Sequence, residues 1–390
     1  MSGQINQNKW IWQQQDWPNF SWNKDALAVA LREVTQLQGT LLGKAGAIAA
    51  DSSAQSTLDA LLQNIVQSSA IEGEVVNVES VRSSLAKRLG VKSAGLTAET
   101  AKTEGLAELL VDATQNHQQP LTLERLYQWH HYLFPEKTDD EFILTEVAVG
   151  QLRGDQPMQV VSGPHLKRTI HFEAPPKTAP DNNGKNLEDQ LNYFLTWLQT
   201  SESDNTLDPI LRAAQAHLWF VTLHPFADGN GRLARAITDY ALAQAEHQAI
   251  RFYAMAASIM EKRSEYYQIL EQTQKGQLDI TAWMQWFLNT FKHTLQAALS
   301  RIDFVLLKAR FWQTHAQDGL NVQQIKVLNR LLDGGSEGFE GGLSAAKYKG
   351  LAKVSKATAT RHIQELLEKG CIEKLDGGGR STRYEINWPH

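Results

Sequence analysis

The sequence predicts a mainly α-helical protein that carries one β-hairpin and ends in a compact unit of helices followed by a second hairpin. Three observations support this fold class. Long segments place apolar residues three and four positions apart, which is the spacing of a helix that buries one face. Only residues 147–176 hold clear β-rich runs, which flank a Gly-Pro turn. Glycine pairs at 334–335 and 341–342 separate the C-terminal residues from the rest.

Composition places the chain among globular proteins that are long enough for two or three domains. Its 390 residues are 42% hydrophobic and 21% charged. No apolar run reaches membrane-spanning length and no signal segment opens the chain, so we expect a cytoplasmic protein. Cys371 is the single cysteine, which excludes an internal disulfide and fits a reducing compartment. The net charge of −5 excludes a generally basic nucleic-acid binder.

Four tryptophans mark the N-terminal segment 9–22, KWIWQQQDWPNFSW. Large aromatic side chains are rarely left in water, so we expect this segment to pack on its own domain rather than extend as a free arm. Helices are expected through 27–43 and 99–117. Between them, residues 57–76 read TLDALLQNIVQSSAIEGEVV, and the apolar spacing predicts a helix that ends near Gly73.

The expected hairpin consists of residues 158–162 and 169–172 around the turn Gly163-Pro164-His165. A small structural hairpin that covers the core is the alternative to a functional one. We expect His165 and His171 to be surface or packing residues rather than catalytic ones.

Two helices are expected on either side of the segment HPFADGNGR at residues 224–232. Asp208 followed by Pro209 is typical of an N-cap and a first helical turn. Pro225 disfavours helical conformation in the residue before it, so the first helix should end just before the segment. The second helix should begin around Arg232 and bury one apolar face.

The segment itself supplies the groups that a phosphate-transfer site needs. His224 can take a proton from a hydroxyl nucleophile, and Asp228 can hold a divalent metal ion. The Gly-Asn-Gly turn at 229–231 frees backbone N–H groups at a helix N-terminus, where the positive dipole end favours an anion. Arg232 and Arg235 can neutralise the remaining negative charge. The alternative is a capped helix–loop–helix corner in which His224 is an ordinary hydrogen-bonded histidine.

This segment resembles the signature of Fic-domain proteins, His-x-Phe-x-Asp/Glu-Gly-Asn-Gly-Arg-x-x-Arg, at every defined position. The resemblance implies transfer of AMP from ATP to a Ser, Thr or Tyr hydroxyl of a target protein, with Mg²⁺ as the metal. The roles it implies are a general base (His224), an apolar loop anchor (Phe226), a magnesium ligand (Asp228), an anion cradle (Gly229, Asn230 on the α-phosphate, and Gly231) and arginines for the β- and γ-phosphates (Arg232 and Arg235). Because Gly231 keeps the third glycine, the phosphotransferase variant of the family, which carries a lysine in that region, is disfavoured.

A second resemblance to the family lies upstream. Ser68, Glu72 and Gly73 match its inhibitory motif, Ser/Thr-x-x-x-Glu-Gly/Asn. The resemblance implies that Glu72 pairs with Arg235 and occupies the guanidinium that should hold the γ-phosphate. ATP would then bind with its α-phosphate misoriented, and the loss of near-attack geometry would slow transfer. The alternative is an ordinary surface helix that ends at Gly73 with a solvated Glu72.

Three other features gain an expected role from the same resemblance. The N-terminal tryptophan segment is similar to an extension found in one bacterial Fic subgroup. The hairpin region 147–176 resembles the flap on which Fic proteins pair an extended stretch of their target. The pattern Arg-x-x-Tyr-Tyr, which ends in Tyr266 and Tyr267, resembles the helix that walls the adenine pocket, although aromatic residues at helical spacing also form cores. Tyr266 and Tyr267 are therefore candidate nucleotide contacts.

Residues 343–390 change character and resemble a winged helix-turn-helix. A helix through 347–353 and one capped by Ser355 precede strands at 371–375 and 383–386. This region holds nine Lys or Arg against five Asp or Glu, a net of +4, whereas the remainder carries −9. A DNA-binding module would contact the major groove through Thr358, Thr360, Arg361 and Gln364. Arg380 and Arg383 would contact phosphates or the minor groove. The alternative is a protein-interaction or dimerisation module, because the fold does not fix the function.

We therefore expect an N-terminal helical region with the inhibitory helix (1–98), a Fic-type helical domain with a hairpin flap (99–300) and a C-terminal winged-helix domain (301–390). The predicted function is that of a protein adenylyltransferase, held mostly off by Glu72, that modifies a target protein or itself. Two alternatives stay open: a de-AMPylase that uses the same site, and a DNA-binding regulator whose Fic site senses a nucleotide. The target protein, the modified hydroxyl and the oligomeric state, including a homodimer, are not defined by the sequence.

Overall fold

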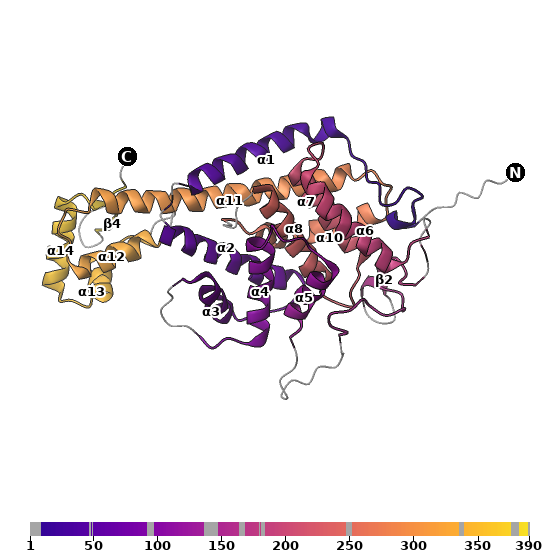
Figure 1. The fold of residues 1–390 in the computed structure, drawn as a ribbon. Helices are drawn as coiled ribbons and strands as arrows, with labels where there is room; N and C mark the ends of the chain where they lie inside the picture. Colours follow the sequence, from indigo (N-terminus) through magenta and orange to yellow (C-terminus); the bar gives the residue numbers. More distant parts are fainter. Residues whose placement is uncertain are drawn as a thin grey trace. The chain divides into compact units, whose positions relative to one another are not determined.

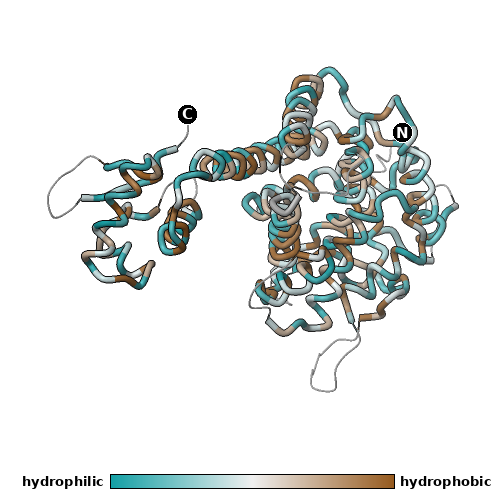
Figure 2. The backbone as a smooth tube through the Cα atoms, turned by 60° about the vertical axis from the view of Figure 1, so that its left-hand side comes forward, coloured by the Kyte–Doolittle hydropathy of each residue, from teal (hydrophilic) through white to brown (hydrophobic). Residues whose placement is uncertain are grey.

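The computed structural model describes residues 9–46, 48, 50–91, 97–135, 147–163, 168–178, 180, 184–246, 252–334, 339–375 and 382–388. The chain forms two compact units, Met1–Ala298 and Leu299–His390. Both are mainly helical, as expected (Figure 1). Hydrophobic and hydrophilic stretches alternate along most helices, as expected for helices that bury one face (Figure 2). Over the described residues, no helix combines the length and the apolar character needed to cross a membrane.

The first unit holds the hairpin and most of the helices. It begins with η1 (Ile11–Gln13), α1 (Lys24–Ala45), α2 (Ala50–Ile71), α3 (Val78–Leu89), α4 (Ala101–Gln115) and α5 (Leu123–Leu133). The hairpin of β1 (Gln159–Ser162) and β2 (Thr169–Glu173) follows. The chain continues with α6 (Leu187–Thr200), η2 (Ser201–Ser203), α7 (Pro209–Leu223), α8 (Asn230–Glu246), α9 (Met255–Glu261), α10 (Arg263–Gln274) and the first part of α11 (Thr281–Thr314).

Helices α7 and α8 form the centre of the first unit (Figure 1). Asp208 caps α7 by accepting hydrogen bonds from the N–H groups of Ile210 and Leu211, as the Asp-Pro pair predicts. Almost every residue of both helices is buried. The predicted apolar face of α8 is buried, and the other faces, including Arg232 and Arg235, are buried as well because other helices surround it. The helix begins at Asn230, two residues earlier than predicted.

The N-terminal tryptophans pack on the first unit, which confirms the prediction. Trp10 and Trp17 are buried. Trp10 meets the β2 residue Phe172 edge to face, with ring centroids 5.5 Å apart. Trp12 donates from Nε1 to the carbonyl of Glu173 at 2.7 Å. The N-terminal segment therefore supports the base of the hairpin.

The second unit contains the end of α11, then α12 (Val322–Leu332), α13 (Ala345–Ala352), α14 (Lys356–Glu368) and the antiparallel strands β3 (Ile372–Lys374) and β4 (Tyr384–Ile386). Its core includes Phe311, Leu328, Tyr348 and Ile363. Ser355 caps α14 as predicted, whereas α12 was not foreseen although Asn321 and Gln324 form a capping box at its start.

The residues considered for DNA contact lie on or beyond α14. Thr360, Arg361 and Gln364 are exposed on this helix, and Arg361 lies 3.6 Å from the acid Glu365. Arg380 lies outside the described residues.

Candidate active site

His224 ends α7 in a left-handed conformation, with φ 48°. Its backbone N–H donates to the carbonyl of Phe220 at 3.1 Å, and Pro225 prevents the helix from continuing. The half-buried ring makes a 3.1 Å hydrogen bond from Nδ1 to the carbonyl of Val221. Because a carbonyl can only accept, Nδ1 carries the proton, and Nε2 of the neutral ring keeps a free lone pair.

The surroundings of His224 favour its neutral form. Burial lowers the pKa of His224 below the ordinary value. The hydrogen bond to the carbonyl of Val221 raises this pKa, and the charge of Arg153 lowers it further. Glu72 and Asp228 raise the pKa by smaller amounts. A neutral imidazole at neutral pH can act as a general base.

Asn230 closes the loop between the two helices. Its Oδ1 accepts from the N–H of Phe226 at 3.0 Å, and its Nδ2 donates to the carbonyl of Phe226 at 2.8 Å. Both ends of the amide are therefore used within the loop, although an amide has a second N–H and a second acceptor lone pair. The α-phosphate contact that the resemblance implied stays a prediction, and the backbone N–H of Asn230 at the start of α8 is a further candidate donor.

Asp228 and Gly229 occupy the turn before α8. Asp228 is exposed, and its Oδ1 accepts from the N–H of Gly229 at 2.6 Å. Gly229 has φ +81°, and a Cβ there would lie 3.0 Å from side-chain atoms of Leu133 and Phe134. Only glycine fits this position without strain.

Glu72 lies at the N-terminus of α8, where the sequence places the anion cradle. Its Oε1 accepts from Nη2 of Arg235 at 2.7 Å. A Cβ built on Gly231 would lie only 2.2 Å from the same oxygen, so the carboxylate packs directly on this glycine. Burial alone would raise the pKa of Glu72, but the charge and hydrogen bond of Arg235, with the charges of Arg232 and His224, bring it below the ordinary value. Glu72 is therefore ionised.

Ser68, the first residue of the predicted inhibitory motif, contacts the same arginine. Nε of Arg235 donates to Oγ of Ser68 at 2.8 Å, and Nη2 donates to the carbonyl of Ser68 at 3.0 Å. Gly73 follows α2 with φ +82°. This left-handed residue ends the helix and places Glu72 beside α8.

A second carboxylate, Glu74, pairs with Arg232. The distance from Nη1 of Arg232 to Oε2 of Glu74 is 2.9 Å, and Lys102 of α4 lies 3.2 Å from the same oxygen. The Arg232 side chain is 3% exposed and that of Glu74 28%. Both motif arginines are therefore paired with acids from the segment at the end of α2. Sequence reasoning missed Glu74, and its position two residues after Glu72 was the only signal.

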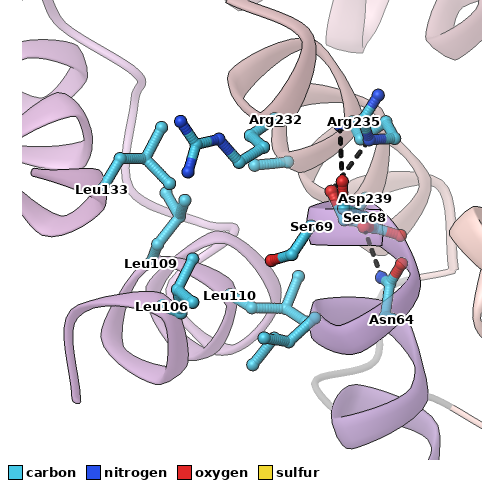
Figure 3. Close-up of a pocket in the computed structure, with 12 residues that line it drawn as sticks. Asn64, Ser68, Ser69, Leu106, Leu109, Leu110, Leu133, Arg232, Arg235 and Asp239 are labelled. Atoms are coloured by element: carbon cyan, nitrogen blue, oxygen red, sulfur yellow. Dashed lines mark hydrogen bonds between the residues drawn. The ribbon is translucent and has the colours of Figure 1, made fainter. Parts of the chain in front are cut away.

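A cavity of about 30 Å³ lies behind these arginines, between α2, α4 and α8 (Figure 3). Arg232 and Arg235 reach it from α8 and Ser69 from α2, while Leu106, Leu109 and Leu110 of α4 provide an apolar wall. Among the described residues, Ser69 Oγ, Arg232 Nε and Arg235 Nη1 are buried without a hydrogen-bond partner. A cavity of this size has room for about two water molecules, and these three groups could hydrogen-bond to them.

The two tyrosines of α10 have different surroundings. Tyr266 is buried, and its hydroxyl makes a 2.9 Å hydrogen bond to Nε2 of His217. Tyr267 is partly exposed, and its hydroxyl donates to the carbonyl of Ile71 at 3.1 Å, beside Nε of Arg263 at 2.7 Å. In this structure Tyr266 belongs to the core, whereas Tyr267 holds the end of α2. An adenine contact stays a prediction for Tyr267.

Two buried basic side chains that sequence reasoning missed brace the loop. His130 of α5 accepts from the N–H of Gly150 at 2.9 Å and contacts the carbonyl of Asp228 at 3.2 Å. Its ring stacks on Phe226 with a centroid distance of 4.2 Å. Arg153 donates from Nε to the carbonyl of His224 at 2.8 Å.

The expected hairpin is present beside this loop. β1 pairs with β2 in antiparallel register, and Val160 and Val161 of β1 are exposed. His171 makes hydrogen bonds to Ser162 at 2.5 Å and to Glu271 of α10 at 2.7 Å, so it fastens the hairpin. His165 lies outside the described residues.

Comparison with known protein families agrees with this geometry. Residues 120–242, which include the whole loop between α7 and α8, match the model described as "Fic/DOC family". The chain contains a Fic/DOC domain. Residues 10–91, which include α2, match a model described as "Domain of unknown function (DUF4172)".

Curated relatives of the chain include two proteins that are named as transferases. "Uridine 5'-monophosphate transferase" from Xanthomonas campestris pv. campestris is 35% identical over 127 residues, which are 32% of this chain and 21% of that protein. "Protein adenylyltransferase Fic" from Nematostella vectensis is 28% identical over 247 residues, 62% of this chain and 49% of that protein. The chain therefore spans less than half the length of either relative.

Solved structures show the same fold. A Fic family protein from Desulfovibrio desulfuricans G20 superposes with a TM-score of 0.54 at 17% identity, covering 94% of this chain and 97% of that one. A Fic domain containing signaling protein from Bacteroides thetaiotaomicron gives a TM-score of 0.51 at 17% identity, covering 70% of this chain and 97% of that one.

Proposed function

We propose that this chain transfers AMP from ATP to a hydroxyl side chain of a target protein or of itself, and that Glu72 holds the reaction mostly off. The observation that carries the proposal is the single corner between α7 and α8, which brings together a base with a free Nε2, an exposed carboxylate and a helix N-terminus flanked by Arg232 and Arg235. The name of the Nematostella vectensis relative supports the activity.

The residues of the corner can perform an in-line transfer. Nε2 of His224 takes the proton from the target hydroxyl while that oxygen forms a bond to the α-phosphorus of ATP. The bond from the α-phosphorus to the bridging oxygen breaks, and pyrophosphate leaves. Arg232 and Arg235, with the first N–H groups of α8, stabilise the negative charge on the phosphates.

Asp228 fits the role of a Mg²⁺ ligand. Its carboxylate is exposed, and only Oδ1 has a hydrogen bond among the described residues. Mg²⁺ commonly takes one or two protein carboxylates and completes its shell with phosphates and water. When bound, the ion would neutralise phosphate charge beside the start of α8.

Repression follows from the position of Glu72. Its ionised carboxylate lies on Gly231 and pairs with Arg235, so it occupies the place where a phosphate would bind. A nucleotide would lose one guanidinium and meet a like charge at the helix N-terminus. Glu72 therefore hinders productive placement of the phosphates rather than the chemistry of His224.

The nucleotide is tested in the same experiment, because the Xanthomonas campestris relative is named for uridine 5'-monophosphate. Wild-type, Glu72→Gly and Glu72→Gly/His224→Ala protein are incubated with Mg²⁺ and α-labelled ATP or UTP, and label on protein is measured. We expect label from ATP, strongest in Glu72→Gly and absent from the double variant. Label from UTP alone would mean that the chain transfers UMP rather than AMP.

Absence of label from both nucleotides in all three proteins would contradict the transfer. Removal of AMP from a modified target would then support a de-AMPylase. Specific DNA binding that survives His224→Ala would instead support a regulator that acts through residues 343–390.

A further inference from the structure

Arg153 is a buried arginine between the hairpin and the catalytic loop. The residue is 2% exposed, and among the described residues its Nη1 has no hydrogen-bond partner. Its Nε donates to the carbonyl of His224 at 2.8 Å, and its Nη2 donates to the carbonyl of Pro175. Its backbone N–H donates to the carbonyl of Pro225 at 3.0 Å. One guanidinium thus joins the loop to the end of the hairpin.

We propose that Arg153 is a positioning residue that fixes the backbone of His224 and keeps the general base in register with the hairpin on which a target docks. The inference rests on the proposed function. His224 has φ 48°, a conformation that non-glycine residues rarely adopt and that the surroundings must hold in place. Within the described part of the chain, the side chains of Arg153 and Asn230 both bond the backbone of the segment 224–226.

The charge of Arg153 also acts on the base. Burial lowers the pKa of Arg153 to about 10, which shows the cost of a cation without an acidic partner. The same charge lowers the pKa of His224, whereas Glu72 on α2 and Asp228 on the loop raise it. Replacing Arg153 by a neutral side chain should therefore raise the pKa of His224, whereas a lysine that keeps the charge should leave this contribution in place.

Two substitutions separate position from charge, both in the Glu72→Gly protein. Arg153→Lys keeps the positive charge but lacks the planar fork that bonds two carbonyls. Arg153→Met removes the charge and the bonds. Arg212→Met is the matched control, because Arg212 is also 2% exposed and also bonds a carbonyl, that of Leu198, but it lies near the start of α7.

The first readout is self-labelling with α-labelled ATP as a function of ATP concentration and pH. We expect both Arg153 variants to lose at least about tenfold in maximal rate, because misplacing a general base forfeits much of its contribution. The ATP concentration for half-maximal rate should not change, since the contacts of α8 remain. In Arg153→Met alone, the acid limb of the pH–rate profile should move to higher pH. The relative rate at low pH should fall by roughly threefold for each half unit by which the pKa of His224 rises.

The second readout does not depend on activity. Titration of His224 by imidazole NMR, assigned with His224→Ala, should give a higher pKa in Arg153→Met and little change in Arg212→Met. A parent protein that labels nothing would count against the proposed function, and the NMR titration would still decide this inference. Arg153→Met that labels like Arg212→Met at equal folded fraction, or His224 ring resonances that are the same in Arg153→Lys and Arg153→Met as in the parent, would overturn it.

Discussion

Replacement of Glu74 by glutamine tests whether the second acid keeps Arg232 from a nucleotide. Arg232 is almost fully buried and donates to Glu74 at 2.9 Å. A nucleotide that uses Arg232 must displace this carboxylate. Because glutamine keeps the shape but loses the charge, Glu74→Gln should make the displacement easier and ATP binding tighter.

The size of the effect follows from the burial of the pair. A hydrogen bond to a charged group contributes about 1.5–3 kcal/mol, and the partial exposure of Glu74 reduces this to about 1 kcal/mol. That value corresponds to an ATP dissociation constant lower by about fivefold. The free energy of unfolding should fall by a similar amount, because Arg232 loses its charged partner. A lower ATP dissociation constant together with a lower free energy of unfolding would therefore indicate that Glu74 competes with the nucleotide for Arg232.

Calorimetric titration with ATP and Mg²⁺, together with urea unfolding, measures both quantities. Lys102→Gln is a control that removes the other partner of Glu74, and Glu99→Gln removes an acid that pairs with Lys87 rather than with a motif arginine. Neither should tighten ATP binding. An unchanged dissociation constant in Glu74→Gln, alongside a lower one in Glu72→Gln, would show that Glu74 does not compete with the nucleotide.

Three further outcomes follow from the structure. Asp208→Ala removes the cap of α7 and should lower the free energy of unfolding by about 1 kcal/mol, measured by urea unfolding; no loss would mean that the cap is not important. Burial lowers the pKa of His130 to about 4. Because an unfolded histidine titrates near 6.5, the unfolded chain binds more protons between these values, so stability is lost as pH falls through this window. The melting temperature should therefore fall from about pH 7 to about pH 5, and by less in His130→Gln; an equal fall would contradict the assignment. Asp228→Asn in the Glu72→Gly protein should abolish the Mg²⁺ stimulation of labelling, and unchanged stimulation would place the metal elsewhere.

Local signals in the sequence predicted much of the corner. Pro225 placed the end of α7, Asp208 placed its start, and the β-rich runs gave the hairpin. The contact between Glu72 and Arg235 came from the family motif, since nothing in the local pattern distinguishes a buried carboxylate from a solvated one. Helix α12 was missed although the sequence carries its signals, a capping box at Asn321 and Gln324 and apolar residues at helical spacing through 322–332.

The contacts that could not be predicted join distant parts of the chain. Arg232 and Glu74 are 158 positions apart, and their pairing depends on how α2 packs beside α8. Arg153 bonds backbone carbonyls, which every residue possesses, so no residue type in the sequence identifies its partners. The amide of Asn230 could serve a phosphate or the loop, and only the folded loop shows that Phe226 takes both of its ends.

The most direct test of repression by Glu72 compares the self-labelling rate of Glu72→Gly with that of the wild type at saturating ATP and Mg²⁺. Removal of the carboxylate from Gly231 and Arg235 should raise the rate by at least about tenfold, because it restores near-attack geometry of the phosphates. Arg235→Ala in that background should weaken the use of ATP. Equal rates in wild type and Glu72→Gly, with both proteins folded, would show that α2 is a structural helix and that Glu72 does not control the site.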